Sequence, residues 1–230
     1  MSPEINIINE DCMTAMSRMV DKQYQLAIVD PPYGIGMMDS DNKSRGKLAK
    51  AKDYKKIHDS DSPNVEYFQQ LQRVSVNQVI FGANHFISKN PIDSSCWLVW
   101  DKDNGNNDFA DCELAWTNFK TAVRRFKYRW NGMLQQDMKN KEHRIHPTQK
   151  PVALYQWILK NYAKPGDRIL DTHGGSCSLA IACDIMGFDA VICEIDKDYY
   201  AAAVERFNRH KQQQVLDFGG CVDGKGCAQN

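Results

Sequence analysis

Residues 26–33 of the chain read Leu-Ala-Ile-Val-Asp-Pro-Pro-Tyr. The four apolar residues at the start are typical of a buried strand, and the proline pair ends the strand because proline fixes φ and lacks a backbone donor. This pattern favours an open α/β sheet, which binds its ligands at the carboxyl ends of its strands. We therefore expect Asp30 and Tyr33 to lie beside a ligand.

The tetrapeptide Asp30-Pro31-Pro32-Tyr33 suits an amino group attached to a flat ring. The Asp30 carboxylate and the Pro31 carbonyl can accept two hydrogens, and the Tyr33 ring can stack on the bound ring. These four residues are the candidate catalytic residues. An ordinary strand followed by a Pro-Pro turn is the alternative, so the surroundings have to decide.

A second candidate site lies far downstream, where a strand, a glycine turn and a helix are predicted in succession. The strand covers residues 168–170, the helix covers residues 178–186, and the turn reads Asp171-Thr172-His173-Gly174-Gly175-Ser176. Adjacent glycines let the backbone approach a ligand closely, and the start of a helix favours a carboxylate or phosphate. A tight connection without a ligand is the plain alternative.

Acidic residues end the next predicted strand. Residues 190–193 are apolar, Glu194 follows them, and Asp196 lies two positions later. An acidic residue about 20 positions after such a glycine turn commonly accepts hydrogen bonds from ribose hydroxyls. The downstream site is therefore expected to hold a nucleotide-like cofactor.

In these motifs the chain resembles the amino-methyltransferases that modify exocyclic amines of DNA bases. The resemblance rests on the Asp30 box, residues 146–151 (His-Pro-Thr-Gln-Lys-Pro), the Asp171 glycine turn and the strand end at Glu194. The catalytic box precedes the cofactor turn, as in the β class of that family. The resemblance spans roughly residues 4 to 210. It implies a Rossmann-like fold with a seven-stranded, mostly parallel sheet, helices on both faces and bound S-adenosylmethionine.

The resemblance implies a set of cofactor-binding residues on several segments. They are Asp11, Cys12, Asp30, His146, Thr148, Lys150, Asp171, His173, Gly174, Gly175, Ser176, Glu194 and Asp196. A strand at residues 5–8 and a helix at residues 12–19 precede the Asp30 strand. In the family's sheet the first strand lies beside the one that ends at Glu194, which implies a circularly permuted motif order completed by a helix over residues 198–213. Asp11 can equally cap its own helix.

The glycine turn departs from the family's commonest pattern, Asp-Pro-Phe-x-Gly-Ser-Gly-Thr. His173 supplies a flat face where phenylalanine is usual, whereas Cys177 stands where glycine is usual. If the backbone at Cys177 needs a positive φ, its side chain adds strain.

Composition agrees with one globular domain over residues 1–218 and a disordered polar tail over residues 219–230. The chain has 230 residues, of which 42% are hydrophobic and 25% charged, which is ordinary globular usage. With neither a membrane-spanning run nor a signal peptide, we expect a cytoplasmic protein that does not bind membranes. Its cysteines read as reduced and buried. His143 and His146 invite a metal reading, but we expect no metal, because no further ligand accompanies them.

The charge distribution favours double-stranded DNA as partner although the formal net charge is zero. Residues 120–150 contain nine basic and two acidic residues with interleaved aromatic side chains, as expected of a short DNA-recognition region. A second basic cluster lies in residues 34–62, which we expect to form a mobile loop that orders on DNA; a solvated loop is the alternative. The candidate DNA contacts are Lys43, Arg45, Lys47, Arg124, Arg125, Arg129, Lys139 and Lys141.

The expected reaction is methyl transfer to the N6 amine of a flipped-out adenine, since the family's cytosine members usually begin the box with serine. Cytosine N4 is the first alternative. A catalytically silent DNA-binding protein that keeps the fold is the second, and an amine in RNA or protein is the third. Asn84, which follows another predicted strand, is a candidate for the base pocket. The sequence leaves the oligomeric state open, a homodimer included.

Overall fold

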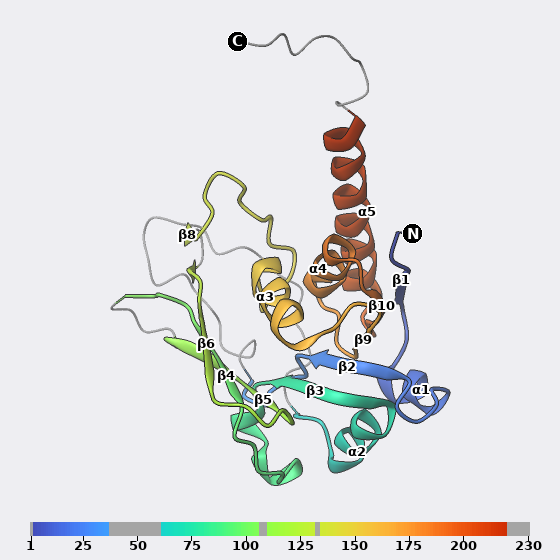
Figure 1. Cartoon of the computed structure of the whole chain (residues 1–230), viewed down its shortest axis with the longest axis vertical. Helices are drawn as coiled ribbons and strands as arrows, with labels where there is room; N and C mark the ends of the chain where they lie inside the picture. The colour runs from blue at the N-terminus through green and yellow to red at the C-terminus, as the bar shows by residue number, and fades with distance from the viewer. Residues whose placement is uncertain (1, 37–60, 106–109, 132–133, 220–230) are drawn as a thin grey trace.

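The structure is a computed structural model, and it describes residues 2–36, 61–105, 110–131 and 134–219. One sheet of eight strands forms the centre, with helices on both faces (Figure 1). The strands lie in the order β1 (Ile5–Ile8), β10 (Asp189–Cys193), β9 (Arg168–Asp171), β2 (Tyr24–Val29), β3 (Ser75–Phe81), β5 (Cys112–Thr117), β4 (Trp97–Asp101) and β6 (Arg124–Lys127). All run parallel except β5, which is antiparallel to both of its neighbours.

The alternation of side chains along β2 explains why this strand lies at the centre of the sheet. Leu26 and Ile28 pack on one face with α3 (Val152–Tyr162) and α4 (Ser178–Met186). Ala27 and Val29 pack on the other face with α1 (Cys12–Ser17) and α2 (Val65–Val74). Because a strand directs successive side chains to opposite faces, a fully apolar strand must be covered by both helix layers.

The last helix, α5 (Lys197–Gly219), follows β10 and projects past the sheet (Figure 1). The predicted helix ended at residue 213 and the predicted tail began at residue 219. The helix boundary is wrong, because no glycine or proline interrupts the chain between residues 197 and 218 and α5 continues to Gly219. The tail stays a prediction. Residues 220–230 lie outside the described part. No helix in the described part is long and apolar enough to cross a membrane.

The number of strands and the end of the first helix also differ from the sequence prediction. The sheet has eight strands rather than seven, because β6 pairs with the free edge of β4. Its exposed Arg124 and Arg125 precede Phe126, which packs on the core, and basic residues are common on edge strands. The first helix ends at Ser17, two residues early, where Arg18 donates to the last carbonyls.

The expected pairing of the first strand with the strand that precedes Glu194 is confirmed. β1 pairs in parallel with β10, with Ile8 opposite Cys193. Asn9 then donates a side-chain hydrogen bond of 2.8 Å to the carbonyl of Glu194. The segment that enters α1 therefore lies at the same edge of the sheet as the end of β10.

Candidate active site

The two predicted motifs meet at the carboxyl ends of adjacent strands. β2 and β9 are hydrogen-bonded neighbours, with Ala27 opposite Leu170. Asp30 directly follows β2, and Asp171 ends β9. Residues more than 140 positions apart are thus brought to one edge of the sheet, where open α/β sheets bind ligands.

The Asp30 carboxylate is held by two hydrogen-bond donors. Lys150 Nζ donates to Asp30 Oδ2, and the Tyr33 hydroxyl donates to Asp30 Oδ1 over 2.8 Å. Burial raises the pKa of Asp30, while the Lys150 ammonium opposes that rise. The carboxylate is therefore fixed in orientation and is a better proton acceptor than an exposed aspartate.

Lys150 lies beside Asp30 of the Asp-Pro-Pro-Tyr box, whereas the resemblance implied a contact with the cofactor. Its side chain is only 2% exposed, and its Nζ lies 3.1 Å from Glu113 Oε2 and 4.7 Å from the centre of the Phe81 ring. Burial would lower the pKa of Lys150, but the carboxylates of Asp30 and Glu113 hold it above the usual value. The ammonium thus stays charged at neutral pH.

Glu113, on β5, is a site residue that the sequence analysis missed. Besides Lys150 it pairs with Lys102 over 2.6 Å. Burial would raise the pKa of Glu113, but the two ammonium groups hold it down, to about 2. Asp30, Lys150, Glu113 and Lys102 form a charge-neutral row of two acids and two bases. The sequence signal was a single carboxylate among the mostly apolar residues of β5.

The Tyr33 ring is positioned by the turn after β3. It stacks on His85, with ring centres 5.1 Å apart and an interplanar angle of 17°. Gly82 has a φ of 68°, and a Cβ there would meet the Tyr33 ring at 2.1 Å. Only glycine fits this position, because both the backbone and the ring exclude a side chain. His85 is a second residue that sequence reasoning missed, and Asn84 beside it is exposed.

The glycine turn has the conformation that its sequence suggested. A Cβ on Gly174 would meet Ile192 Cγ2 at 2.6 Å, so the turn packs directly against β10. Gly175 has a φ of 49°. Cys177 also has a positive φ, 54°, and it is buried at the start of α4. The strain that the sequence raised is therefore present at Cys177, where burial of its side chain offsets it.

Acidic groups surround this turn. Glu194 accepts from the backbone N–H of Gly175 over 2.7 Å and from that of Asp196 over 2.8 Å. Burial raises the pKa of Asp171 to about 7, although its Oδ1 accepts from the His173 N–H over 2.9 Å. Burial raises the pKa of Glu194 as well. A cation bound here would stabilise the ionised form of both carboxylates and lower their pKa values.

The flanks of the turn bring in the remaining predicted cofactor residues. Asp11 caps α1, accepting from Thr14 N over 2.9 Å, which confirms the capping alternative. The half-buried Cys12 follows it, and burial raises the pKa of that thiol to about 12.

From the opposite flank, the ring of His146 lies over the glycine turn, since a Cβ on Gly175 would be 3.7 Å from it. His146 Nδ1 lies 3.1 Å from Thr148 Oγ1. The Tyr67 hydroxyl lies 2.7 Å from Thr172 Oγ1, a contact that sequence reasoning missed.

The basic recognition region is partly neutralised by its neighbours. The parallel pairing of β6 with β4 brings Arg125 within 3.7 Å of Asp101, and Arg129 within 2.7 Å of Asp103. Lys139 and Lys141 are exposed on the chain between β8 (Leu134–Gln135) and α3. Lys43, Arg45 and Lys47 lie outside the described residues. In the described part, no three histidine, cysteine or acidic residues group as metal ligands would.

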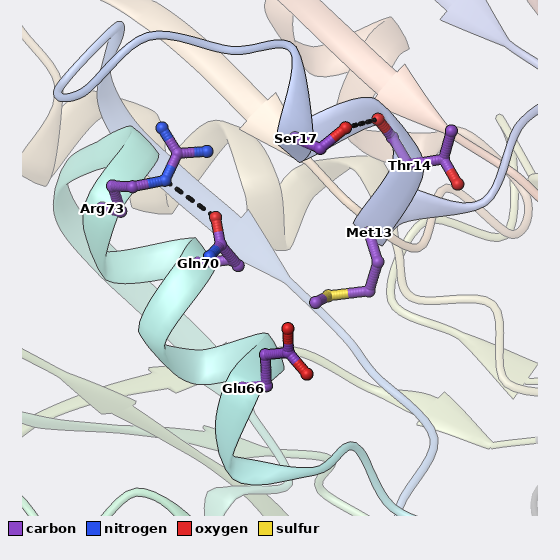
Figure 2. A pocket seen from close by; sticks show the side chains of 6 residues that line it. All are labelled: Met13, Thr14, Ser17, Glu66, Gln70 and Arg73. Atoms are coloured by element: carbon purple, nitrogen blue, oxygen red, sulfur yellow. Dashed lines mark hydrogen bonds between the residues drawn. The ribbon is translucent and has the colours of Figure 1, made fainter.

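A groove of about 560 Å³ lies between α1 and α2 (Figure 2). Its lining is mostly polar and partly bonded to itself: Ser17 Oγ donates to the Thr14 carbonyl, and Arg73 Nε donates to Gln70 Oε1. None of the residues predicted for catalysis, cofactor or DNA lines this groove. The groove therefore adds nothing to the candidate site.

Comparison with solved structures supports the fold. The chain is similar to M1.HpyAVI in its SAM complex (21% identity, TM-score 0.52, covering 88% of this chain and 99% of that one). It is also similar to TTHA0409 from Thermus thermophilus complexed with S-adenosyl-L-methionine (16%, 0.54, 90% and 95%). A third similar structure is the cytosine-N4-specific PvuII DNA methyltransferase (13%, 0.57, 94% and 91%). The sheet and helix layers are those of the α/β methyltransferase fold.

Sequence comparison identifies the family. The type II methyltransferase M.HpaI from Haemophilus parainfluenzae is 36% identical over 69 residues, which make up 30% of this chain and 22% of that relative. The chain thus matches about a fifth of the length of that curated protein. The family described as DNA methylase (N6_N4_Mtase) matches residues 51–205, two thirds of the 230 residues. The chain belongs to the N6/N4 DNA methylase family.

Proposed function

We propose that this protein transfers a methyl group from S-adenosylmethionine to the N6 amine of an adenine flipped out of double-stranded DNA. The observation that carries the proposal is the adjacency of the Asp30 box and the glycine turn at the ends of β2 and β9. Two of the similar structures are complexes with S-adenosylmethionine. The family of this chain acts on DNA.

The residues around the glycine turn fit this cofactor. Gly174 lets the turn pack directly against β10, and Gly175 lies beneath the His146 ring, while Asp171, Glu194 and Asp196 supply carboxylates at one edge. In the proposed complex Glu194 accepts from the ribose, with Asp11 and Cys12 beside the adenine ring and His173, Ser176, His146 and Thr148 around the remainder. When bound, the sulfonium supplies the methyl group. Its positive charge complements the acids Asp171 and Glu194, whose pKa values burial raises.

The catalytic box then has to prepare a weak nucleophile. An aromatic amine delocalises its lone pair into the ring, so its nitrogen attacks poorly until its hydrogens are held by acceptors. Asp30 Oδ1 and the Pro31 carbonyl can accept them, and Lys150 orients Asp30 and opposes the rise in its pKa that burial causes. Transfer would form the N–C bond as the methyl–sulfur bond of the donor breaks and a neutral thioether leaves, and Asp30 would accept the proton that the amine loses. Positioning and charge therefore supply most of the catalysis.

Tyr33 and Pro32 complete the box. A duplex hides the amine from the methyl donor, so the base must leave the stack at a cost of a few kcal/mol. We infer that Tyr33, which already stacks on His85, receives the flipped ring. The carboxyl ends of β2 and β3 would thus form the base pocket. One copy of the chain carries all of these described residues, so the chemistry does not require a homodimer.

The remaining assignments extend the same proposal. We infer that β1 beside β10 reflects a circularly permuted motif order, and that residues 1–218 form one catalytic domain. The exposed bases Arg124, Arg125, Arg129, Lys139 and Lys141 are proposed to contact DNA phosphates. The basic loop proposed for residues 34–62 lies largely outside the described residues.

The deciding experiment incubates the protein with methyl-labelled S-adenosylmethionine and duplex DNA and then identifies the labelled nucleoside. We expect N6-methyladenine, and we expect Asp30→Ala to abolish transfer while cofactor binding persists. N4-methylcytosine would establish the alternative favoured by the similarity to the cytosine-N4-specific PvuII enzyme. Transfer by Asp30→Ala at the normal rate would refute the assigned role. Binding without any transfer by the wild type would indicate a silent DNA-binding protein.

A further inference from the structure

The buried guanidinium of Arg206 connects α5 to the glycine turn. Arg206 is only 9% exposed. Its Nη1 donates to the Ser176 carbonyl over 2.7 Å and to Ser178 Oγ over 2.9 Å. The Arg206 side chain therefore binds the last part of the proposed cofactor turn and the first residue of α4.

The other nitrogen of the same guanidinium binds Glu142. Arg206 Nη2 donates to Glu142 Oε2 over 2.7 Å, and Glu142 Oε1 accepts from the backbone N–H of Val152 over 3.0 Å. Val152 begins α3 two residues after Lys150, the partner of Asp30. The Glu142 carboxylate thus joins the cofactor turn to the segment that holds the catalytic carboxylate.

Glu142 also belongs to the arm, which we define as residues 134–149 and which arches between β8 and α3 (Figure 1). The side-chain amide of Gln135, on β8, makes two hydrogen bonds to the backbone of Glu142. Gln135 Nε2 donates to the Glu142 carbonyl, and the Glu142 N–H donates to Gln135 Oε1, both over 2.8 Å. The exposed Lys139 and Lys141 lie between these two residues. Any displacement of the arm by a bound phosphate backbone is therefore transmitted to Glu142.

A simple structural anchor does not require this particular choice of groups. Burial lowers the pKa of Arg206 and raises that of Glu142, so the pair is costly to desolvate and its ionised form depends on the contact. The same helix carries an ordinary anchor: Asp184 of α4 accepts from His210 over 3.0 Å and from Lys211 over 2.8 Å. That second cluster touches neither the glycine turn nor the arm in any of its described contacts. It serves as a matched control.

We propose that Arg206 and Glu142 are positioning residues that couple cofactor binding at the glycine turn to DNA binding at the arm. The inference rests on the proposed function, since it assumes that the turn binds the cofactor and the arm binds DNA. Ordering of the turn fixes the Ser176 carbonyl, which fixes the guanidinium and, through Glu142, the arm. Each ligand then binds more tightly in the presence of the other, by the same factor.

The test measures the affinity of a fluorescent duplex with and without S-adenosylhomocysteine, the unreactive product of the cofactor. For the wild type we expect S-adenosylhomocysteine to tighten DNA binding by at least about fivefold, the lower end of typical coupling. In Glu142→Gln, which keeps the shape but removes the charge, the factor should fall below about twofold while each ligand still binds alone. Gln135→Ala, which frees the arm without touching the buried charges, should reduce the factor as well.

Asp184→Asn should keep the wild-type factor, because it weakens an anchor of the same kind elsewhere on α5. A wild-type factor near one overturns the proposal, and so does a fivefold factor that survives in both Glu142→Gln and Gln135→Ala. These outcomes are distinct from failure of the proposed function, in which the wild type transfers no methyl group to DNA at all. Gln135→Ala decides the matter if Glu142→Gln does not fold.

Discussion

Replacing Lys150 with methionine tests whether its buried ammonium holds the carboxylate of Asp30, the residue proposed for catalysis. The substitution keeps the apolar stem and removes an ammonium that is 2% exposed and contacts both Asp30 and Glu113. Removing one partner of a buried ion pair costs about 3–5 kcal/mol, because the other charge stays buried without compensation. Glu113 retains Lys102, so Asp30 bears most of this cost. In a domain of this size the loss corresponds to a Tm lower by roughly 6–20 °C.

Thermal and urea unfolding at several pH values measure the effect. We expect the difference in the free energy of unfolding between Lys150→Met and the wild type to decrease as the pH falls from 8 to 5, since protonation removes the unpaired charge of Asp30. Lys211→Met is the control: Lys211 also pairs with a buried carboxylate, but it is 42% exposed and shares Asp184 with His210. That variant should lose less than about 1 kcal/mol. A loss equally small for Lys150→Met, or one independent of pH, would refute the reasoning.

Two further substitutions probe the site. The pKa of Asp171 is about 7 in the folded protein and about 3.9 in the unfolded chain. The contribution of Asp171 to stability is therefore fully present below pH 4 and is lost as the pH rises through 7. Asp171→Asn, followed by urea unfolding between pH 4 and 8, should remove that slope and raise stability at pH 8 by up to about 4 kcal/mol, while calorimetry shows weaker cofactor binding. Gly82→Ala should destabilise the protein more than Gly166→Ala in thermal melts; both have a positive φ, but only at Gly82 would a Cβ meet the Tyr33 ring. Equal losses would contradict the steric role of Gly82.

The elements that the sequence predicted well are those whose signals are local. The apolar run at residues 26–29 became β2, and the helix predicted over residues 178–186 has those bounds in the structure. In both cases the hydrophobic pattern and a proline or glycine boundary agree, and tertiary contacts reinforce what the segment favours by itself. The pairing of β1 with β10 left no local signal, and only the resemblance to a permuted family predicted it.

The partners of Asp30 show why the rest was out of reach. A lone carboxylate in the strand Cys112–Thr117 is typical of a solvent-facing strand position, yet Glu113 lies in the charge row with Lys150 and Lys102. A buried acid is tolerable only beside a base, and sequence separation gives no measure of which base the sheet brings near. The order β2-β3-β5-β4 decides this, because β5 returns antiparallel beside β3 and carries Glu113 to the edge where Asp30 lies. The carboxylate proposed for catalysis could therefore be predicted from its motif, but the charges beside it follow from the topology of the whole sheet.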